Sequence, residues 1–219
     1  FDAQAIKAKL DANNLEQVLF NLPAGDWDAG DRGIAVDPAR VEEFQAGVPK
    51  AIAYAKALGC TQVNCLAGIV PQGVTQQDAQ SAFVINLHYA ANALAAEGIS
   101  LVIEAINTRD IPGFFLNTTE QAKAIIKEVG SDNLSIQYDI YHMQIMEGDL
   151  TPTMQQNIGQ IAHVQLADNP GRHEPGTGEI NYPFVLNYLD ELGYQGWVGC
   201  EYKPKTTTTE GLGWLHQYR

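Results

Sequence analysis

Strand-like and helix-like segments alternate along almost the whole of this chain of 219 residues. The runs EQVLFNL, TQVNCLAG and SLVIEAIN have the short apolar pattern of strands, and longer amphipathic stretches lie between them. One helix is predicted over 38–59, with Pro38 near its start and Gly59 at its stop. Another is predicted to open at Thr75, with Asp78 three residues later. This alternation predicts βαβ units and a parallel sheet.

Six strands are predicted, and no loop between them resembles a nucleotide-binding loop. The strands cover residues 16–22, 61–68, 100–107, 133–142 (with the exit from the strand), 161–168 and 196–202. Neither G-x-G-x-x-G nor G-x-x-x-x-G-K-[ST] occurs. A doubly wound nucleotide-binding sheet is therefore disfavoured.

Four consecutive strands carry an oxygen-bearing side chain near their C-terminal ends. These residues are Glu104, Asp139, Gln165 and Glu201, at separations of 35, 26 and 36 residues. A TIM barrel of about 250 residues uses about 31 residues for each of its eight units, so this spacing fits a barrel. In a barrel the C-terminal strand ends meet at one face, and the four side chains would converge there.

This set of three carboxylates and one amide predicts a metal site. Three carboxylates cannot share a dry pocket unless a cation offsets their charge. Ligands that are all oxygen suit a divalent metal such as Mg²⁺ or Mn²⁺ better than Zn²⁺. Alternatively, each residue is a separate polar group at a strand end, but four residues in phase with the barrel repeat favour the metal site. Glu201 follows the apolar run GWVGC, which is predicted to be a buried strand.

Charge and cysteine content limit the classes of partner. The net charge is −13 and no block rich in Lys or Arg occurs, which opposes binding to nucleic acid. No apolar run is long enough to cross a membrane, and no signal peptide is recognisable. Three cysteines without a C-x-x-C pair indicate structural thiols in a reducing, cytoplasmic compartment. The sequence is compatible with a homo-oligomer.

Four segments together carry a family resemblance that extends along the whole chain: IEAINTRDIPGFFLNTTEQA, QYDIYHMQIMEGDLT, HVQLADNPGRHEPGTGEINY and GWVGCEYKPKTTTTEGLGW. They resemble the hydroxypyruvate isomerase family, one of the xylose isomerase-like TIM barrels, which also include tagatose/psicose 3-epimerases and endonuclease IV. The resemblance implies an α/β fold of the TIM (β/α)8 type. It also implies a divalent metal held by Glu104, Asp139, Gln165 and Glu201, with Glu104 and Glu201 as the catalytic acid/base pair.

The activity that the resemblance implies is an aldose–ketose type isomerisation. Hydroxypyruvate and 2-hydroxy-3-oxopropanoate (tartronate semialdehyde) would interconvert through an enediolate, in glyoxylate metabolism. The family pattern suggests that His142 contacts the substrate or supports the residues that do. Arg172 would bind the substrate carboxylate, because a planar guanidinium matches a carboxylate with two hydrogen bonds. Asp110 could line the same face.

Rival functions come from the same fold and from outside enzymology. An isomerase of a four-carbon acid such as 2-oxotetronate shares the motifs, and a ketose 3-epimerase would not need a carboxylate-binding Arg172. A DNA-repair endonuclease is disfavoured by the charge and by the lack of a His-rich zinc cluster. A fragment that serves only folding or assembly is the non-enzymatic alternative.

The chain is expected to form a single TIM-barrel domain over 1–219 that is incomplete at its N-terminus. Family members begin with a strand, a helix and a second strand, whereas this chain begins at Phe1 inside the segment that would follow. The six predicted strands agree with this, because two more strands would complete the eight. Two strand edges would then be unpaired, so the activity of this chain is in doubt.

Overall fold

Six parallel strands form one sheet in the computed structural model, which describes residues 1–218. Their order in the sheet, β1-β2-β3-β4-β5-β6, is the order of the sequence. The strands are β1 (Phe20–Asn21), β2 (Gln62–Cys65), β3 (Ser100–Glu104), β4 (Leu134–Asp139), β5 (Ile161–Leu166) and β6 (Val198–Cys200). The six predicted strands and their parallel arrangement are confirmed.

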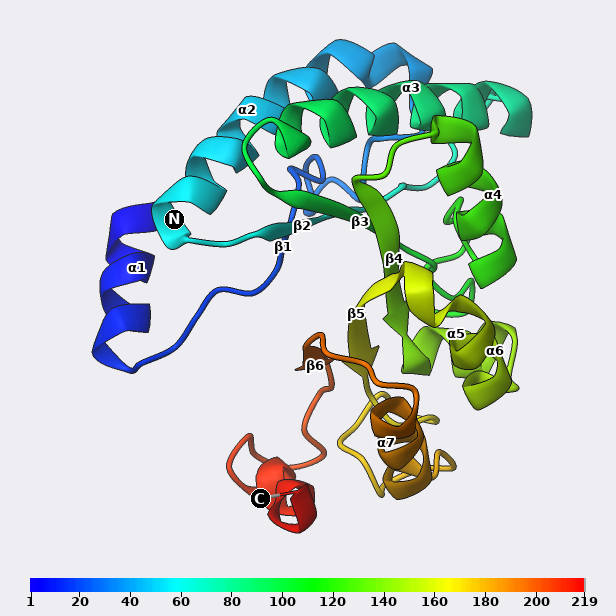
Figure 1. Ribbon diagram of the computed structural model, residues 1–219. Coiled ribbons are helices and arrows are strands. Elements are labelled where there is room, and N and C mark those ends of the chain that lie inside the picture. Colours follow the sequence, from blue (N-terminus) through cyan, green and yellow to red (C-terminus); the bar gives the residue numbers. More distant parts are fainter. Residues whose placement is uncertain (219) are drawn as a thin grey trace.

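Helices connect the strands and lie along the outer side of the curved sheet (Figure 1). They are α1 (Ala3–Ala12), α2 (Val41–Leu58), α3 (Gln76–Ala95), α4 (Thr119–Val129), α5 (Ile140–Met146), α6 (Leu150–Asn157) and α7 (Tyr182–Glu191). Three 3₁₀ segments, η1 (Pro38–Arg40), η2 (Ile158–Gln160) and η3 (Glu210–Tyr218), complete the elements. Sheet and helices together form a curled half-barrel, in which α1 and η3 lie near the two ends of the arc (Figure 1).

Helix ends follow the capping chemistry that the sequence predicts. The hydroxyl of Thr75 accepts a hydrogen bond from the backbone N–H of Asp78, so Thr75 caps α3 as expected. The α2 helix ends at Gly59, whose φ of 70° places it in the left-handed region that favours glycine. Pro38 is the first residue of η1, directly before α2.

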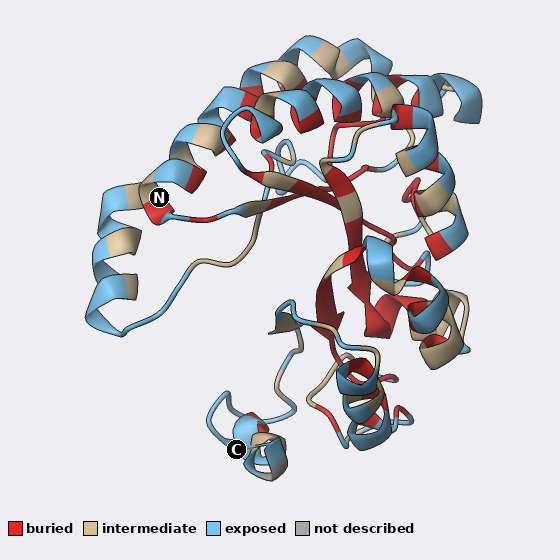
Figure 2. Ribbon diagram, viewed as in Figure 1, coloured by how far each residue is buried: buried red, intermediate tan, exposed pale blue. Residues whose placement is uncertain are grey.

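The two faces of the sheet differ in polarity because side chains alternate along each strand. Val63, Ile103 and Val164 are fully buried and belong to the hydrophobic core that continues into the helices. The side chains on the other face include buried polar groups, namely Asn64, Glu104, Gln137, Asp139, His163 and Gln165. Burial is concentrated in the central strands (Figure 2). The inner side of the half-barrel is therefore the polar side.

Two segments differ from the predictions in local detail. The fourth strand ends at Asp139 as predicted, but the predicted exit over 140–142 is the first turn of α5, because the Asp139 side chain caps that helix. The segment around β6 is not buried: Trp197 is 60% exposed and Cys200 is exposed. Among the described residues β6 pairs with β5 alone, so one of its edges and much of its surface face solvent.

No helix within residues 1–218 is long and apolar enough to cross a membrane.

Candidate functional site

The predicted metal-binding residues lie at one end of the sheet, where β3, β4 and β5 finish. Glu104 is the last residue of β3, and Asp139 is the last residue of β4. The strand register pairs Asp139 with Gln165 on β5, and it pairs Gln165 with Gly199 on β6. Parallel strands therefore bring these side chains to one edge, as the spacing in the sequence predicted.

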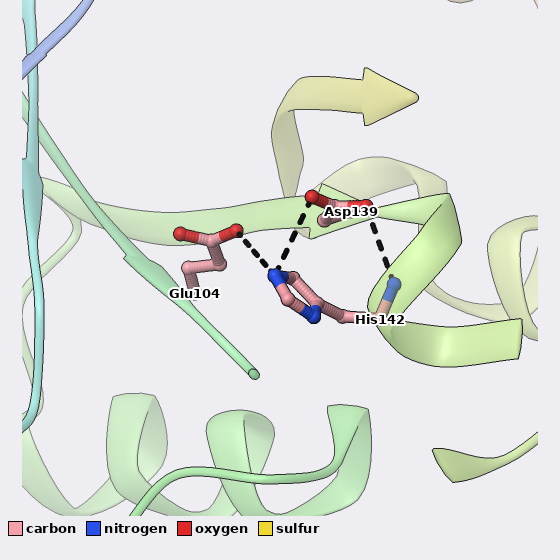
Figure 3. Close-up of side chains that lie close together, drawn as sticks. All are labelled: Glu104, Asp139 and His142. Carbon is pink, nitrogen blue, oxygen red and sulfur yellow. Dashed lines mark hydrogen bonds and ion pairs between the residues drawn. The ribbon is translucent and has the colours of Figure 1, made fainter. Parts of the chain in front are cut away.

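Glu104, Asp139 and His142 form a compact buried cluster at this edge (Figure 3). Each contributes a potential ligand atom, and these atoms all lie within 4.8 Å of one another. The Nε2 atom of His142 lies 3.9 Å from Glu104 Oε1 and 3.7 Å from Asp139 Oδ2. His142, expected to contact substrate, thus lies directly beside the two acids.

The two oxygens of Asp139 have different surroundings. Oδ1 accepts hydrogen bonds from the backbone N–H groups of Tyr141 (2.8 Å) and His142 (3.3 Å), which fixes the start of α5. Oδ2 is buried without a hydrogen-bond partner, and so is Oε1 of Glu104. Buried oxygens without partners cost free energy, so this pair suits a cation that would satisfy both. The chemistry of these residues therefore fits a hard divalent metal.

The electrostatics of the cluster also favour positive charge. Burial, followed by the charges of Asp139 and Glu201, raises the pKa of Glu104 well above its ordinary value. Burial likewise raises the pKa of Asp139, although Arg172 opposes the shift. Either a proton or a metal ion would relieve this repulsion. Burial lowers the pKa of His142 to about 4, so its imidazole is neutral near pH 7.

Gln165, the predicted amide ligand, is held by a neighbour that sequence reasoning missed. Its Oε1 accepts a hydrogen bond of 2.6 Å from Nε2 of Gln137. Gln137 lies two residues before Asp139 in β4 and therefore points to the same side of the sheet. Its register partner on β3 is Glu104. The signal was present in the sequence, because a second polar residue in phase with Asp139 interrupts an apolar strand.

Asn64 is a second residue of the site that the sequence analysis missed. Its Nδ2 donates to Oδ1 of Asn21 (3.0 Å) and lies 3.4 Å from Oε2 of Glu104. It is fully buried in β2, where it interrupts the apolar run. Asn64 therefore donates a hydrogen bond to Oε2 of Glu104, the oxygen that does not face His142.

Glu201 is connected to the cluster through Arg172. Nη2 of Arg172 donates to Oε2 of Glu201 (2.6 Å) and lies 3.8 Å from Oδ2 of Asp139. The guanidinium also lies over the Tyr141 ring, 5.1 Å from its centroid. Partial desolvation and the charge of Asp139 raise the pKa of Glu201, while Arg172 opposes this shift. Because 54% of the Glu201 side chain is exposed, water weakens these effects.

Asp110 is held by hydrogen bonds from its neighbours. Its Oδ2 accepts hydrogen bonds from the Tyr141 hydroxyl (2.8 Å) and from Nδ2 of Asn107 (3.2 Å). These bonds outweigh its partial burial and lower its pKa. Asp110 thus lies beside the predicted substrate residues, joined to them through Tyr141 and Asn107.

The loop that carries Arg172 is organised around the buried carboxylate of Asp168. This carboxylate accepts four backbone N–H groups, from Asn169, Gly176, Gly178 and Ile180. Gly178 approaches so closely that a Cβ atom there would lie 2.2 Å from the carbonyl oxygen of Asn169. The loop that carries Arg172 is therefore tightly packed around Asp168.

Comparison with known proteins identifies relatives along the whole described chain. Residues 1–218 match the family model for the xylose isomerase-like TIM barrel. The chain is 55% identical to hydroxypyruvate isomerase of Escherichia coli (strain K12), over 100% of this chain and 85% of the relative. It is 46% identical to 2-oxo-tetronate isomerase of Cupriavidus necator, over 99% of this chain and 83% of the relative.

A solved structure has almost the same backbone. The crystal structure of AP endonuclease, family 2, from Brucella melitensis superposes with a TM-score of 0.97 at 44% sequence identity. The match covers 100% of this chain and 84% of that chain. These matches confirm the predicted fold class.

The Asp168 carboxylate gives a testable account of the loop. Asp168→Ala leaves four backbone N–H donors without their acceptor, and those of Asn169 and Ile180 are buried, so the free energy of unfolding should fall by about 3 kcal/mol or more. Urea denaturation measures this loss, and limited proteolysis should cut the loop faster than in the wild type. The control Glu120→Ala removes an exposed carboxylate from α4 and should cost less than about 0.5 kcal/mol. Equal stability of the two variants would contradict the account.

Proposed function

The chain belongs to the hydroxypyruvate isomerase group of the xylose isomerase-like TIM barrel family, and on this premise we propose that it interconverts hydroxypyruvate and 2-hydroxy-3-oxopropanoate. The relatives show that the chain is an isomerase, and the identity of its substrate is what we propose. The observation that carries the proposal is the position of Arg172 beside the buried acids Glu104 and Asp139. A 2-oxo acid matches this arrangement, because its carboxylate would bind the guanidinium and its adjacent carbonyl would lie at the acidic centre.

The proposed metal ligands are Glu104, Asp139, Gln165 and Glu201, and the oxygens of Glu104 and Asp139 that lack partners support this assignment. When bound, Mg²⁺ or Mn²⁺ would polarise the carbonyl and hydroxyl oxygens of the substrate as a Lewis acid. The role of the protein is to hold oxygen donors at the ends of rigid strands. Gln137 supports this role because its amide fixes the Gln165 oxygen.

Proton transfer is assigned to Glu104 and Glu201. One glutamate removes a proton from C3 of hydroxypyruvate, and the other returns a proton to C2. The hydroxyl proton passes from the C3 oxygen to the C2 oxygen, so the hydroxyl and carbonyl groups exchange places without loss of atoms. The intermediate between the two steps is an enediolate. The raised pKa values of both glutamates suit groups that hold a proton during turnover. Glu104 ends β3 and Glu201 directly follows β6, so the two residues would approach a planar intermediate from separate parts of the sheet.

A four-carbon acid is the second candidate substrate, because the relative from Cupriavidus necator is a 2-oxo-tetronate isomerase. Both candidates carry a carboxylate beside a carbonyl, so Arg172 and the acids would bind either one. A nucleic-acid substrate is not proposed, because the net charge of −13 opposes contact with a phosphate backbone.

Replacement of either glutamate tests the proton transfer. Glu104→Gln and Glu201→Gln retain size but cannot carry a proton, so each should lower kcat on hydroxypyruvate by about 100-fold or more. Circular dichroism should show that both variants fold. Glu120→Gln, which alters an exposed acid of α4, should leave kcat unchanged. A glutamine variant with near-normal turnover would remove that glutamate from the mechanism.

Removal of metal tests the proposed centre. Exhaustive chelation should abolish turnover and lower the melting temperature, because a ligand that binds only the folded state stabilises it. Addition of Mg²⁺ or Mn²⁺ should restore both properties. Asp139→Asn should weaken metal affinity, as measured by isothermal titration calorimetry, because an amide replaces a charged ligand. Full activity in a protein shown by elemental analysis to be metal-free would refute the metal site.

Replacement of Arg172 tests whether the substrate is an acid or a neutral sugar. Arg172→Gln should raise KM for hydroxypyruvate and 2-oxotetronate by about 10- to 100-fold, since a charge-assisted hydrogen bond contributes roughly 1.5–3 kcal/mol. The assay panel consists of both acids and a ketohexose, and the ratio of kcat/KM values identifies the better acid. Faster turnover of the ketohexose than of either acid by the wild-type chain would favour a 3-epimerase instead.

A further inference from the structure

His142 receives two hydrogen-bond donors on one nitrogen, and both belong to Asn107. The backbone N–H of Asn107 lies 3.3 Å from Nδ1 of His142. The side-chain Nδ2 of Asn107 lies 2.6 Å from the same atom. Asn107 is fully buried, follows β3, and was not among the predicted site residues.

The orientation of the Asn107 amide is fixed by its other partners. Its Oδ1 accepts hydrogen bonds from the backbone N–H groups of Arg109 (3.0 Å) and Asp110 (2.8 Å), which can only donate. Its Nδ2 also lies 3.2 Å from the Asp110 carboxylate, which can only accept when ionised. If the amide oxygen and nitrogen exchanged positions, the NH2 group would face two backbone N–H donors and the oxygen would face the Asp110 carboxylate. The amide therefore presents a hydrogen to His142.

These contacts determine where the imidazole carries its hydrogen. An atom that faces two N–H donors must be an acceptor, so Nδ1 has no hydrogen. A neutral imidazole then carries its single hydrogen on Nε2. Rotation of the ring by half a turn would place a carbon atom against both Asn107 donors and leave them unsatisfied. The network of Asn107 thus specifies one tautomer of His142.

The hydrogen on Nε2 faces the centre of the site. Nε2 lies 3.9 Å from Glu104 Oε1 and 3.7 Å from Asp139 Oδ2, the two oxygens without partners (Figure 3). Both distances exceed the usual length of a hydrogen bond. The hydrogen is therefore available to an oxygen atom of a molecule bound beside the acids.

We propose that Asn107 is a positioning residue that fixes the Nε2–H tautomer of His142, so that His142 donates a hydrogen bond to a substrate oxygen and is not a metal ligand. Nitrogen that carries a hydrogen has no lone pair for a metal, so His142 belongs to the substrate side of the cluster although it lies within ligand distance of both acids. In turnover the donor would stabilise the oxygen that becomes negative in the enediolate. This role in turnover rests on the proposed function, whereas the tautomer does not.

Nuclear magnetic resonance of histidine labelled with ¹⁵N and ¹³C measures the tautomer directly. The five histidines of the chain give separate signals, and the signal lost in His142→Gln identifies His142. Wild-type protein should show the hydrogen on Nε2, both without metal and after addition of Mg²⁺. A wild-type hydrogen on Nδ1, or loss of the Nε2 hydrogen when Mg²⁺ is added, overturns the proposal.

Asn107→Asp is the decisive variant, because it replaces the donating amide with an acceptor of almost the same size. The hydrogen of His142 should move towards Nδ1, and kcat on hydroxypyruvate should fall by about 10-fold or more with a smaller change in KM. An unchanged His142 signal in the folded variant overturns the proposal. If this variant does not fold, Asn107→Ala retains the backbone donor and should give a mixture of the two tautomers, and a signal identical to wild type would again overturn it.

Asn117→Asp is the matched control in the same loop. Nδ2 of Asn117 donates to the carbonyl oxygens of Ile106 (3.2 Å) and Phe114 (2.7 Å), not to His142. The same chemical change there should leave the His142 signal as in the wild type. A shift equal to that of Asn107→Asp would show that loop distortion moves the tautomer and would overturn the assignment to Asn107. If wild-type enzyme fails to convert hydroxypyruvate but shows the Nε2 hydrogen, the proposed substrate fails and the tautomer assignment stands.

Discussion

The structure depends on the burial of two carboxylates, Glu104 and Asp139, side by side where the strands end. Two like charges that are shielded from water repel strongly. The groups around them therefore matter mainly because they stabilise these carboxylates through hydrogen bonds or positive charge. Asp139 uses one oxygen to begin α5, and Asn64 lies beside one oxygen of Glu104. Arg172 approaches from the loop after β5. One oxygen of each acid is left without a partner, and these two oxygens define the reactive centre.

Neutral hydrogen-bond donors surround much of this centre, and Arg172 adds a permanent positive charge. Asn107 and Gln137 orient their partners through amide hydrogen bonds, and neither adds to the charge of the site. Arg172 provides a fixed positive charge beside Asp139 and Glu201, and the loop that holds it is tied to the buried carboxylate of Asp168. Because the amides add no charge, the net charge of the site can still be changed by a ligand that binds there.

Much of the fold could be predicted from the sequence, because short apolar runs and helix caps are local signals. The strand-end residues were also predictable, since parallel strands of regular spacing must finish at one edge. Gln137 and Asn107 were missed because their importance comes from a partner elsewhere in the chain. The exposure of Trp197 and Cys200 was also missed, because the apolar run GWVGC was interpreted as a buried strand although an unpaired strand edge was expected.

The origin of the site residues within the chain has a consequence for how the molecule is made. Glu104, Asn107, Asp139 and His142 all belong to the continuous stretch from β3 to α5. Arg172 and Glu201 come from later in the chain and join this stretch afterwards. During synthesis from the N-terminus, Glu104 and Asp139 therefore emerge before Arg172, which must carry its positive charge to them, and Glu201 emerges last.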